Sequence, residues 1–396
     1  MYSQSFSPYN LYACASQSER RNSGLSKDDF VQEVETYVGN SIDEGTYEFK
    51  IKILYDLYLN NHPKGSMESI CQDLVLRKLY NNIKRIYSVK QSNRNQIVKQ
   101  MISLLKEESP KWVIRLDIKH FYESINRLRL IERLMEDGRL NFQSVCLIKS
   151  LFAHPIIAEG DGLPRGLSIS SAMSELYMKY FDIGVRRLKG VFYYARFVDD
   201  IIVFCSSQKA QEDVWEHIPK MLGDMGLQLN ESKSYKWSDN QNTIKLVYLG
   251  YAFIPKGKRD LDVVIADKKV NMIKTRITKS FVRFAKDGDF DMLKNRIKFL
   301  TGNFTLSAPS TLLPTKVGIY FNYRFVTDRT ALYELDKYFQ KILHCKMGKL
   351  GSKLSLRMTN AQRVELTKYS FVFGFENHVN HFFTSAILMN VINCWK

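Results

Sequence analysis

Tyr193-Tyr194-Ala195-Arg196-Phe197-Val198-Asp199-Asp200-Ile201-Ile202-Val203-Phe204 is the stretch on which the fold of this chain depends. Two runs of β-branched and aromatic residues flank a pair of acids, and this pattern predicts a strand, a tight turn and a second strand. A single Asp in a turn is ordinary, because Asp tolerates turn conformations. Two adjacent carboxylates repel each other, and each raises the pKa of the other unless a cation lies between them. The hairpin therefore predicts a pair of acids presented to a metal ion.

A second apolar stretch upstream, within residues 111–125, also ends on an acid, Asp117. If it pairs with the hairpin in one antiparallel sheet, the carboxylates of Asp117, Asp199 and Asp200 lie close together. Mg²⁺ prefers one or two carboxylates, with its other ligands from water and substrate phosphates. Two such ions, about 3.5–4 Å apart, promote in-line phosphoryl transfer. The two stretches together predict the chemistry of a polymerase.

The chain resembles reverse transcriptases through five segments in the order typical of that family. The segment around Asp117 resembles motif A, Gly162–Ser170 motif B, Phe197–Asp200 motif C, Gly226–Lys233 motif D and Tyr248–Tyr251 motif E. The resemblance implies an α+β right-hand polymerase with fingers, a palm built on an antiparallel sheet and a helical thumb. The expected divisions are an N-terminal arm (1–25), fingers (26–110, with inserted helices at 126–160), a palm (111–260) and a basic thumb with a C-terminal region (261–396).

The resemblance also implies the activity, an RNA-directed DNA polymerase that makes DNA from dNTPs with two Mg²⁺ ions, or Mn²⁺ in their place. Asp117 and Asp199 are expected to bridge the ions, with the Ile118 carbonyl and Asp200 as further ligands. Lys233 is the candidate that protonates the departing pyrophosphate, a task suited to a positioned side chain. Its alternative is a place in a general basic surface.

Five residues are candidates for binding the incoming nucleotide. Lys90 and Arg94 precede motif A in a basic segment and are expected on the triphosphate, the alternative being a solvated helix face. Tyr122 stands where the family places an aromatic ring under the sugar, so it favours deoxynucleotides or else packs in the core. Gly166 lets the backbone approach the nascent base pair, because glycine has no side chain.

Arg165 departs from the family pattern, because many relatives carry Gln at this place. Three roles are open for it: binding a phosphate, pairing with Glu175, or pairing with Asp161.

Net charge is +17 and is concentrated in the second part of the chain. Residues 1–230 hold 30 Lys and Arg against 28 Asp and Glu, whereas residues 231–396 hold 28 against 13. Such asymmetry is typical of a face that follows a phosphate backbone. The candidates for contacts with primer and template are Tyr248, Gly250, Lys274, Arg276 and Arg283.

The remaining patterns concern local structure and location. A start signal at Ser26 predicts a helix from residue 27, and further helices are expected over residues 51–59 and 67–82. The six cysteines are widely spaced and favour a reduced state. Because no apolar run has the length of a bilayer span, we expect a cytoplasmic protein that does not contact a membrane.

The forms of motif A (Asp117–Ile125) and motif B (Pro164–Gly166) resemble those of bacterial retron, abortive-infection and defence-associated reverse transcriptases. The opening and closing segments resemble the smaller enzyme of a two-polymerase antiviral system. This resemblance implies a dedicated non-coding RNA as template, a DNA product, a second reverse transcriptase as partner and a possible homo-oligomer. Two alternatives stay open: a template-independent or protein-primed nucleotidyltransferase, and a catalytically silent scaffold that binds RNA.

Overall fold

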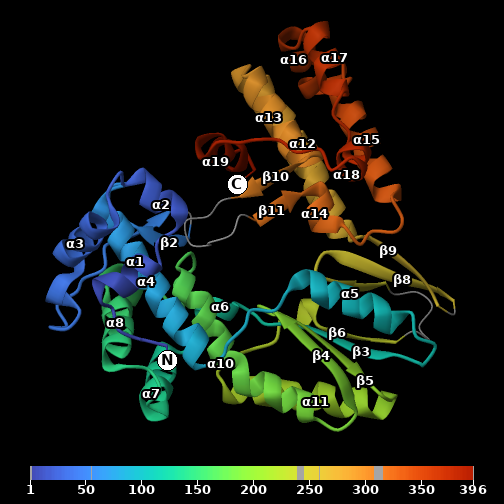
Figure 1. Ribbon diagram of the computed structural model, residues 1–396. Coiled ribbons are helices and arrows are strands. Elements are labelled where there is room, and N and C mark those ends of the chain that lie inside the picture. The colour runs from blue at the N-terminus through green and yellow to red at the C-terminus, as the bar shows by residue number, and fades with distance from the viewer. Residues whose placement is uncertain (1, 55, 239–244, 258, 307–314, 396) are drawn as a thin grey trace. The chain divides into compact units, whose positions relative to one another are not determined.

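The computed structural model describes residues 2–54, 56–238, 245–257, 259–306 and 315–395, and these form two compact units. Unit 1 comprises Met1–Ile97 and Pro110–Gln241, and unit 2 comprises Val98–Ser109 and Asn242–Lys396. Helices and antiparallel sheets occur in both units (Figure 1). The predicted α+β class is confirmed, whereas the boundaries of fingers, palm and thumb stay a prediction.

A four-stranded antiparallel sheet organises unit 1. Its strands are β3 (Trp112–Asp117), β4 (Val191–Phe197), β5 (Asp200–Cys205) and β6 (Tyr235–Ser238), in the order β4-β5-β3-β6. β5 occupies an inner position with Ile201–Cys205 completely buried, as its continuous apolar run requires. Helices α10 (Ser168–Arg187) and α11 (Gln208–Asp224) pack against this sheet (Figure 1). The hairpin predicted around Asp199 therefore corresponds to β4, an outer strand of the sheet, and β5, an inner strand.

The helices expected before the sheet are partly confirmed. Helix α3 (Lys27–Val38) begins after Ser26, whose hydroxyl accepts a hydrogen bond from the Asp29 amide, and α4 (Met67–Ile86) covers the third predicted helix. The prediction of a helix over residues 51–59 is wrong. This segment forms the hairpin β1 (Ile51–Leu54) and β2 (Leu57–Asn60), with Asp56 at a positive φ of 62° in the turn.

Of the segment predicted as an arm (1–25), the described residues 2–25 fold against α3 and α4. They form α1 (Pro8–Ala13) and α2 (Gln17–Asn22), and Leu11 is completely buried. Glu19 forms an ion pair with Arg77 of α4, and Arg77 also donates a hydrogen bond to the Cys14 carbonyl. The other elements of unit 1 are η1 (Gly39–Ser41), α6 (Phe121–Ser124), α7 (Arg127–Asp137), α8 (Phe142–Ala153), α9 (Pro155–Ala158) and η2 (Glu231–Lys233). Helix α5 (Arg94–Leu105) runs across the boundary of the two units.

Unit 2 combines a three-stranded antiparallel sheet with a set of helices. Its sheet has the order β7 (Leu246–Tyr248), β8 (Tyr251–Gly257) and β9 (Asp260–Ile265). The long helix α12 (Asp267–Asp287) packs against α13 (Phe290–Thr301), α15 (Thr330–Leu343) and α16 (Gly348–Arg357). The remaining elements are β10 (Asn303–Leu306), β11 (Thr315–Gly318), α14 (Ile319–Tyr323), α17 (Asn360–Thr367), α18 (Phe371–Glu376) and α19 (Ser385–Asn393).

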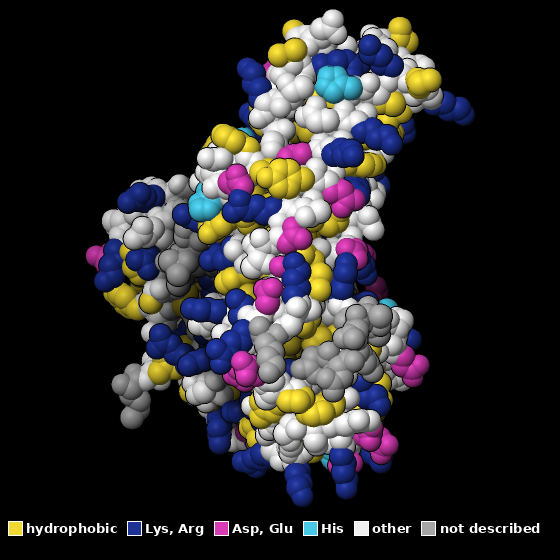
Figure 2. Space-filling view, turned by 90° about the vertical axis from the view of Figure 1, so that its right-hand side faces the viewer, with side chains coloured by type: hydrophobic (Ala, Val, Ile, Leu, Met, Phe, Trp, Pro, Cys, Tyr) yellow, Lys and Arg dark blue, Asp and Glu magenta, His cyan; other side chains and the backbone are white. Residues whose placement is uncertain are grey.

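The surface carries many basic side chains. Figure 2 shows Lys and Arg over much of one face of the molecule, with Asp and Glu between them. In the part of the chain that the structure describes, no helix has both the length and the apolar character that a membrane span requires.

Candidate active site

The acids predicted from the sequence meet at one edge of the unit 1 sheet. Asp117 ends β3 and stands directly opposite Asp200, the first residue of β5. Asp199 lies in the preceding turn, and its carbonyl accepts a hydrogen bond from the Ile118 amide at 3.1 Å. Opposite residues of an antiparallel pair project from the same face. The pairing therefore brings residues 82 or more positions apart in sequence into one site.

The motif D segment runs along the end of β3 and surrounds Asp117. Its Asn230 amide nitrogen donates to the Asp117 carbonyl at 2.7 Å, and the Asn230 side chain donates to Oδ1 at 3.0 Å. The Lys233 ammonium lies 3.0 Å from Oδ1 and 3.2 Å from Oδ2 of the same carboxylate. The Asp117 amide donates to the Ser234 hydroxyl at 3.1 Å. Asp117 is only 5% exposed, and the hydrogen bonds to its carboxylate, carbonyl and amide fix its position.

Burial and mutual repulsion raise the pKa values of the two hairpin acids. Desolvation is the larger effect on the pKa of Asp199, and the charge of Asp117 raises it further, while Lys233 and Arg165 oppose both effects. Desolvation likewise raises the pKa of Asp200, against the opposing effect of the Arg115 guanidinium. Carboxylates held in this way gain from a cation placed between them.

Asp199 and Asp200 have different partners. Arg115, on the same strand as Asp117, donates to Asp200 Oδ1 from Nη2 at 3.2 Å and from Nε at 3.4 Å. The charge of Asp117 contributes to the raised pKa of Asp199. The division of roles expected from the family, with Asp117 and Asp199 as the bridging pair and Asp200 as a neighbour, stays a prediction.

The carboxylates of Asp117 and Asp199 have the donor chemistry for Mg²⁺. Within the residues that the structure describes, no three Asp, Glu, His or Cys side chains are grouped closely enough to hold one ion together. Two carboxylates suffice when phosphates and water complete the ligands. Here the Lys233 ammonium supplies the positive charge next to Asp117. The two carboxylates thus have donor chemistry that suits a divalent cation, and in this structure the Lys233 ammonium occupies the position beside Asp117.

The motif B loop packs closely against the helix that follows Asp117. The Leu163 amide donates to the Tyr122 carbonyl at 2.8 Å, and Gly162, at a φ of 58°, leaves no space for a side chain because a Cβ would lie 2.0 Å from that carbonyl oxygen. Burial raises the pKa of Tyr122, with smaller effects from Ser174, Glu175 and Asp199. Tyr122 is thus partly buried and close enough to Asp199 to be affected by its charge, and its role as a sugar gate stays a prediction.

Arg165 and Gly166 contact different parts of unit 1. The Arg165 guanidinium pairs with Glu123, with Nε 2.6 Å from Oε1, whereas Glu175 pairs with Arg196. The partners suggested by the sequence, Asp161 and Glu175, are thus replaced by Glu123. Gly166, at a φ of 99°, lies against the β2 strand, because a Cβ there would come 2.8 Å from the Tyr58 carbonyl oxygen.

The structure places Lys90 and Arg94 in the segment that connects α4 to α5. Lys90 is exposed, and Arg94 is the first residue of α5. The neighbours of Lys90 in sequence, Val89 and Gln91, line a small cleft with Ser171 of α10. The segment therefore runs beside the motif B helix, and the contact of these two cations with a triphosphate stays a prediction.

In unit 2, Tyr248 and Gly250 form the turn between β7 and β8. Tyr248 pairs with Tyr251 across a two-residue turn in which Leu249 and Gly250 have φ values of 48° and 83°. Positive φ at both positions is typical of the tight turns that match strand twist. Tyr248 is completely buried, Leu249 of the turn is buried as well, and Gly250 is partly exposed.

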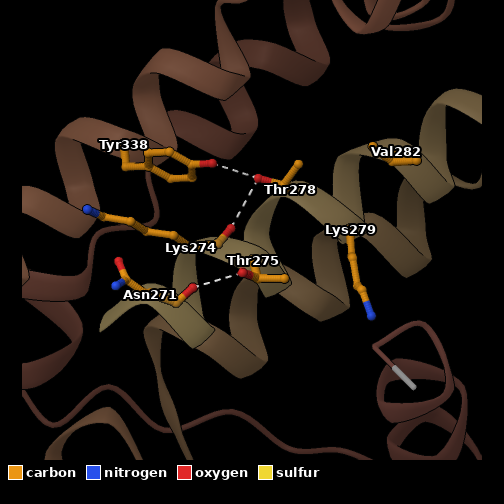
Figure 3. Close-up of a pocket in the computed structure, with 7 residues that line it drawn as sticks. All are labelled: Asn271, Lys274, Thr275, Thr278, Lys279, Val282 and Tyr338. Carbon is orange, nitrogen blue, oxygen red and sulfur yellow. Dashed lines mark hydrogen bonds between the residues drawn. The ribbon is translucent and has the colours of Figure 1, made fainter. Parts of the chain in front are cut away.

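The three basic candidates on α12 all have partners within unit 2. Lys274 lies 2.5 Å from Glu334, Arg276 stacks over the Trp395 ring at 5.1 Å, and Arg283 pairs with Asp287 at 2.9 Å. Beside Lys274 is a groove of about 480 Å³ between α12 and α15 (Figure 3). The residues that line it are Asn271, Lys274, Thr275, Thr278, Lys279 and Val282 from α12, with Tyr338 from α15. Figure 3 shows the hydroxyl groups of Thr278 and Tyr338 joined by a hydrogen bond of 2.8 Å.

Several residues of the site were not found by the sequence analysis. Asn230 and Ser234 lie within or next to motif D, but their contacts depend on pairing with the distant strand β3. Arg115 could have been found, because it precedes Asp117 by two positions and so projects from the same face of its strand. Arg196 stands inside the opening stretch, where a charged residue in an apolar strand is a visible signal.

Comparisons with known proteins agree with the geometry of unit 1. Residues 62–253 match the family model described as reverse transcriptase (RNA-dependent DNA polymerase). Protein P of woodchuck hepatitis B virus (isolate 2) is 24% identical over 190 residues, which are 46% of this chain and 20% of the viral protein. The chain thus spans about a fifth of the length of that relative.

Solved telomerase structures align with this chain at low identity and low TM-scores. Apo telomerase from Candida Tropicalis aligns with 93% of this chain and 69% of its own, at 10% identity and a TM-score of 0.41. Telomerase from Candida albicans in complex with a fragment of telomeric RNA aligns with 81% of this chain and 50% of its own, at 15% identity and a TM-score of 0.38. The segment that matches the reverse transcriptase family model, residues 62–253, includes all three acids at the sheet edge.

Proposed function

We propose that this chain is an RNA-directed DNA polymerase that extends a primer with dNTPs. One observation carries the proposal: inside the segment that matches the reverse transcriptase family, the pairing of β3 with β5 brings Asp117 to Asp199 and Asp200. Desolvation and mutual repulsion raise the pKa values of the two hairpin acids, so these groups gain from a nearby cation.

The residues of the site have distinct roles in the proposed mechanism. Asp117 and Asp199 would hold the divalent cations, with the Ile118 carbonyl and Asp200 close by. Such cations would activate the primer hydroxyl and neutralise charge on the triphosphate. Lys233, whose ammonium contacts Asp117 in the structure, would donate a proton to the departing pyrophosphate. The Tyr122 ring excludes a ribose 2′-hydroxyl by its bulk, so deoxynucleotides are selected.

Nucleic acid is held by both units in this proposal. Lys90 and Arg94 bind the triphosphate, Gly166 allows close approach to the nascent base pair, and Arg165 contacts template or phosphate after release from Glu123. Tyr248 and Gly250 support the primer end. Lys274, Arg276 and Arg283 of α12 follow the phosphate backbone, which the charge surplus of residues 231–396 favours.

The biological setting is a further part of the proposal. The forms of motifs A and B resemble those of bacterial defence-associated enzymes, and on that resemblance the template is a dedicated non-coding RNA used in antiphage defence. A second reverse transcriptase is the expected protein partner, and the location is the cytoplasm.

Sequencing of the DNA product tests the activity. The purified chain is supplied with a primed RNA of known sequence, Mg²⁺ and all four dNTPs, and the product is sequenced with and without the RNA. DNA complementary to the RNA supports the proposal, and its loss in the Asp199→Ala, Asp200→Ala variant assigns it to this site. DNA of a sequence unrelated to the RNA would instead show an untemplated nucleotidyltransferase. No product from the wild type under either condition would contradict both activities.

A further inference from the structure

The turn that carries Asp199 has an unfavourable backbone conformation. Val198, the residue before Asp199, has a φ of 60°. This left-handed region is a clear outlier for a β-branched residue, whose side chain crowds the backbone there. Such a conformation persists only where surrounding contacts impose it. The contacts around Val198 therefore determine where the next residue, Asp199, places its carboxyl group.

A buried arginine supplies one of these contacts. Arg196, two residues before Val198 and 3% exposed, donates a hydrogen bond from Nη1 to the Val198 carbonyl oxygen at 3.0 Å. On the other side of the turn the Ile118 amide binds the Asp199 carbonyl oxygen at 3.1 Å. The two successive carbonyl groups of the turn are thus each held by a donor, one from a side chain and one from β3.

Arg196 is itself anchored to the motif B helix, α10. Its Nη2 lies 2.8 Å from Glu175 Oε2 and 2.8 Å from Asp182 Oδ2, and its Nε lies 2.9 Å from Asp182 Oδ1. Asp182 also accepts a hydrogen bond from the Tyr194 hydroxyl at 2.6 Å. A planar guanidinium that binds two carboxylates is held in both position and orientation. Its contact with Val198 therefore links the turn rigidly to α10.

We infer that Arg196 is a positioning residue, which holds Val198 in the left-handed conformation and thereby directs the Asp199 carboxylate towards Asp117. The inference rests on the proposed function only in that the acids are taken to bind the catalytic cations. Charge alone does not perform this task, because a lysine in place of Arg196 cannot bind Asp182, Glu175 and the Val198 carbonyl together in one plane.

Arg196→Lys is the first test, on full-length protein. Loss of a residue that orients a metal ligand costs about 10–100-fold in activity or metal affinity. We expect kcat for dNTP incorporation to fall in that range, the KM for dNTP to change little, and Mn²⁺ affinity, measured without nucleotide or nucleic acid, to weaken. Tyr194→Phe is the matched control, because it removes a hydrogen bond from the same buried cluster and leaves the Val198 contact. It is expected to lower thermal stability and to leave kcat and Mn²⁺ affinity as in the wild type.

Rescue at Val198 separates positioning from stability. Glycine adopts a φ of 60° without steric cost, so the turn no longer needs Arg196 to impose it. In Arg196→Lys, the additional change Val198→Gly is expected to recover most of the lost kcat and Mn²⁺ affinity without restoring thermal stability. A buried ion pair that served stability alone would show no such rescue.

A second variant covers the case in which Arg196→Lys fails to fold. Arg196→Met combined with Glu175→Gln and Asp182→Asn removes all three charges together, so that no buried charge is left unpaired. The same loss of kcat and the same rescue by Val198→Gly are expected.

The inference is overturned if a folded Arg196 variant keeps the kcat and Mn²⁺ affinity of the wild type, or if Val198→Gly restores neither. An inactive wild type would instead contradict the proposed function, and Mn²⁺ affinity would still report on Arg196.

Discussion

Without a cation, the ionised Asp199 carboxylate lowers the stability of the fold, whereas in the proposed mechanism the same carboxylate binds a cation. Its carboxyl group is partly desolvated and lies close to the charge of Asp117, and both effects raise its pKa. A raised pKa in the folded state means that the folded protein binds this proton more tightly than the unfolded chain does. The ionised group therefore destabilises the fold at pH values above its ordinary pKa of about 3.9.

Asp199→Asn should consequently stabilise the protein when no divalent cation is present. At pH 7 in EDTA the expected change is a higher melting temperature, by about 2–4 °C if the relief is about 1 kcal/mol. The difference should shrink as the pH is lowered and vanish below the ordinary pKa of about 3.9, where the wild-type carboxyl group is protonated in both states. Asp213→Asn, at an exposed position of α11, is the control and should have no effect. A variant less stable than the wild type at pH 7 would contradict this electrostatic account.

Lys233 can act as a charge or as a proton donor, and two substitutions separate these roles. Lys233→Arg keeps a cation beside Asp117, but a guanidinium does not release its proton in this pH range. If Lys233 is the general acid, Lys233→Arg and Lys233→Met should both lower kcat, by about 10²–10⁴-fold, and both should lose the alkaline limb of the pH–rate profile. An arginine variant with the rate and profile of the wild type would leave Lys233 an electrostatic role only.

At the scale of elements, the motif B loop packs closely against the helix after Asp117 because Gly162 has no side chain. Gly162→Ala places a methyl group 2.0 Å from the Tyr122 carbonyl oxygen, so the loop must move and the Leu163 hydrogen bond is lost. Gly138→Ala is a matched control, because Gly138 has nearly the same φ, 57°, with open space around its Cα. Both variants incur the left-handed penalty of about 1–2 kcal/mol.

We expect Gly162→Ala to lower the free energy of unfolding by clearly more than Gly138→Ala does, and to reduce polymerase activity, which Gly138→Ala should retain. Chemical denaturation and primer extension measure the two effects. Equal losses of stability in the two variants would show that the loop accommodates the methyl group.

Local signals were sufficient for some elements and insufficient for others. Helix α3 was predicted because its start signal at Ser26 and its apolar spacing lie within a few residues of each other. The hairpin of β1 and β2 was missed because the apolar residues of the segment fit helical spacing as well. The turn at Asp56 decides between the two structures, and a positive φ at Asp is not readable from composition.

The candidate active site could likewise be predicted from the sequence only in part. Asp117, Asp199, Asp200 and Lys233 could be named from motif register, and the structure brings them to one sheet edge. The contacts that fix them could not be named, because they depend on the path of residues 228–234 beside β3. The role of Arg196 required the conformation of Val198, which only the three-dimensional structure provides.

For the whole molecule, the surplus of positive charge in residues 231–396 predicts binding of nucleic acid that weakens as salt rises. Lys274 and Glu334 form an ion pair beside the α12 groove, so neutralising one or the other should change nucleic-acid binding in opposite directions. Lys274→Gln should weaken binding of an RNA–DNA duplex and reduce the salt slope by about 1, whereas Glu334→Gln should strengthen binding.

Lys294→Gln serves as the control for both variants, because Lys294 is also paired with acids, Asp291 and Glu365, but does not line the groove. Its change in salt slope should be smaller than that of Lys274→Gln. Fluorescence anisotropy over a range of salt concentrations measures all three. Equal effects of Lys274→Gln and Lys294→Gln would mean that the groove has no special part in binding.

The central claim is that Asp117 and Asp199 converge on cations that drive DNA synthesis on RNA. The most direct measurement is single-turnover incorporation of one dNTP on a primed RNA template as Mg²⁺ is titrated, for the wild type, Asp117→Asn and Asp199→Asn. The account predicts a wild-type rate that rises with Mg²⁺ and saturates, and variant rates lower by more than about 100-fold at every concentration. A wild type that incorporates no nucleotide, or an Asp199→Asn variant that matches its rate, would contradict the claim.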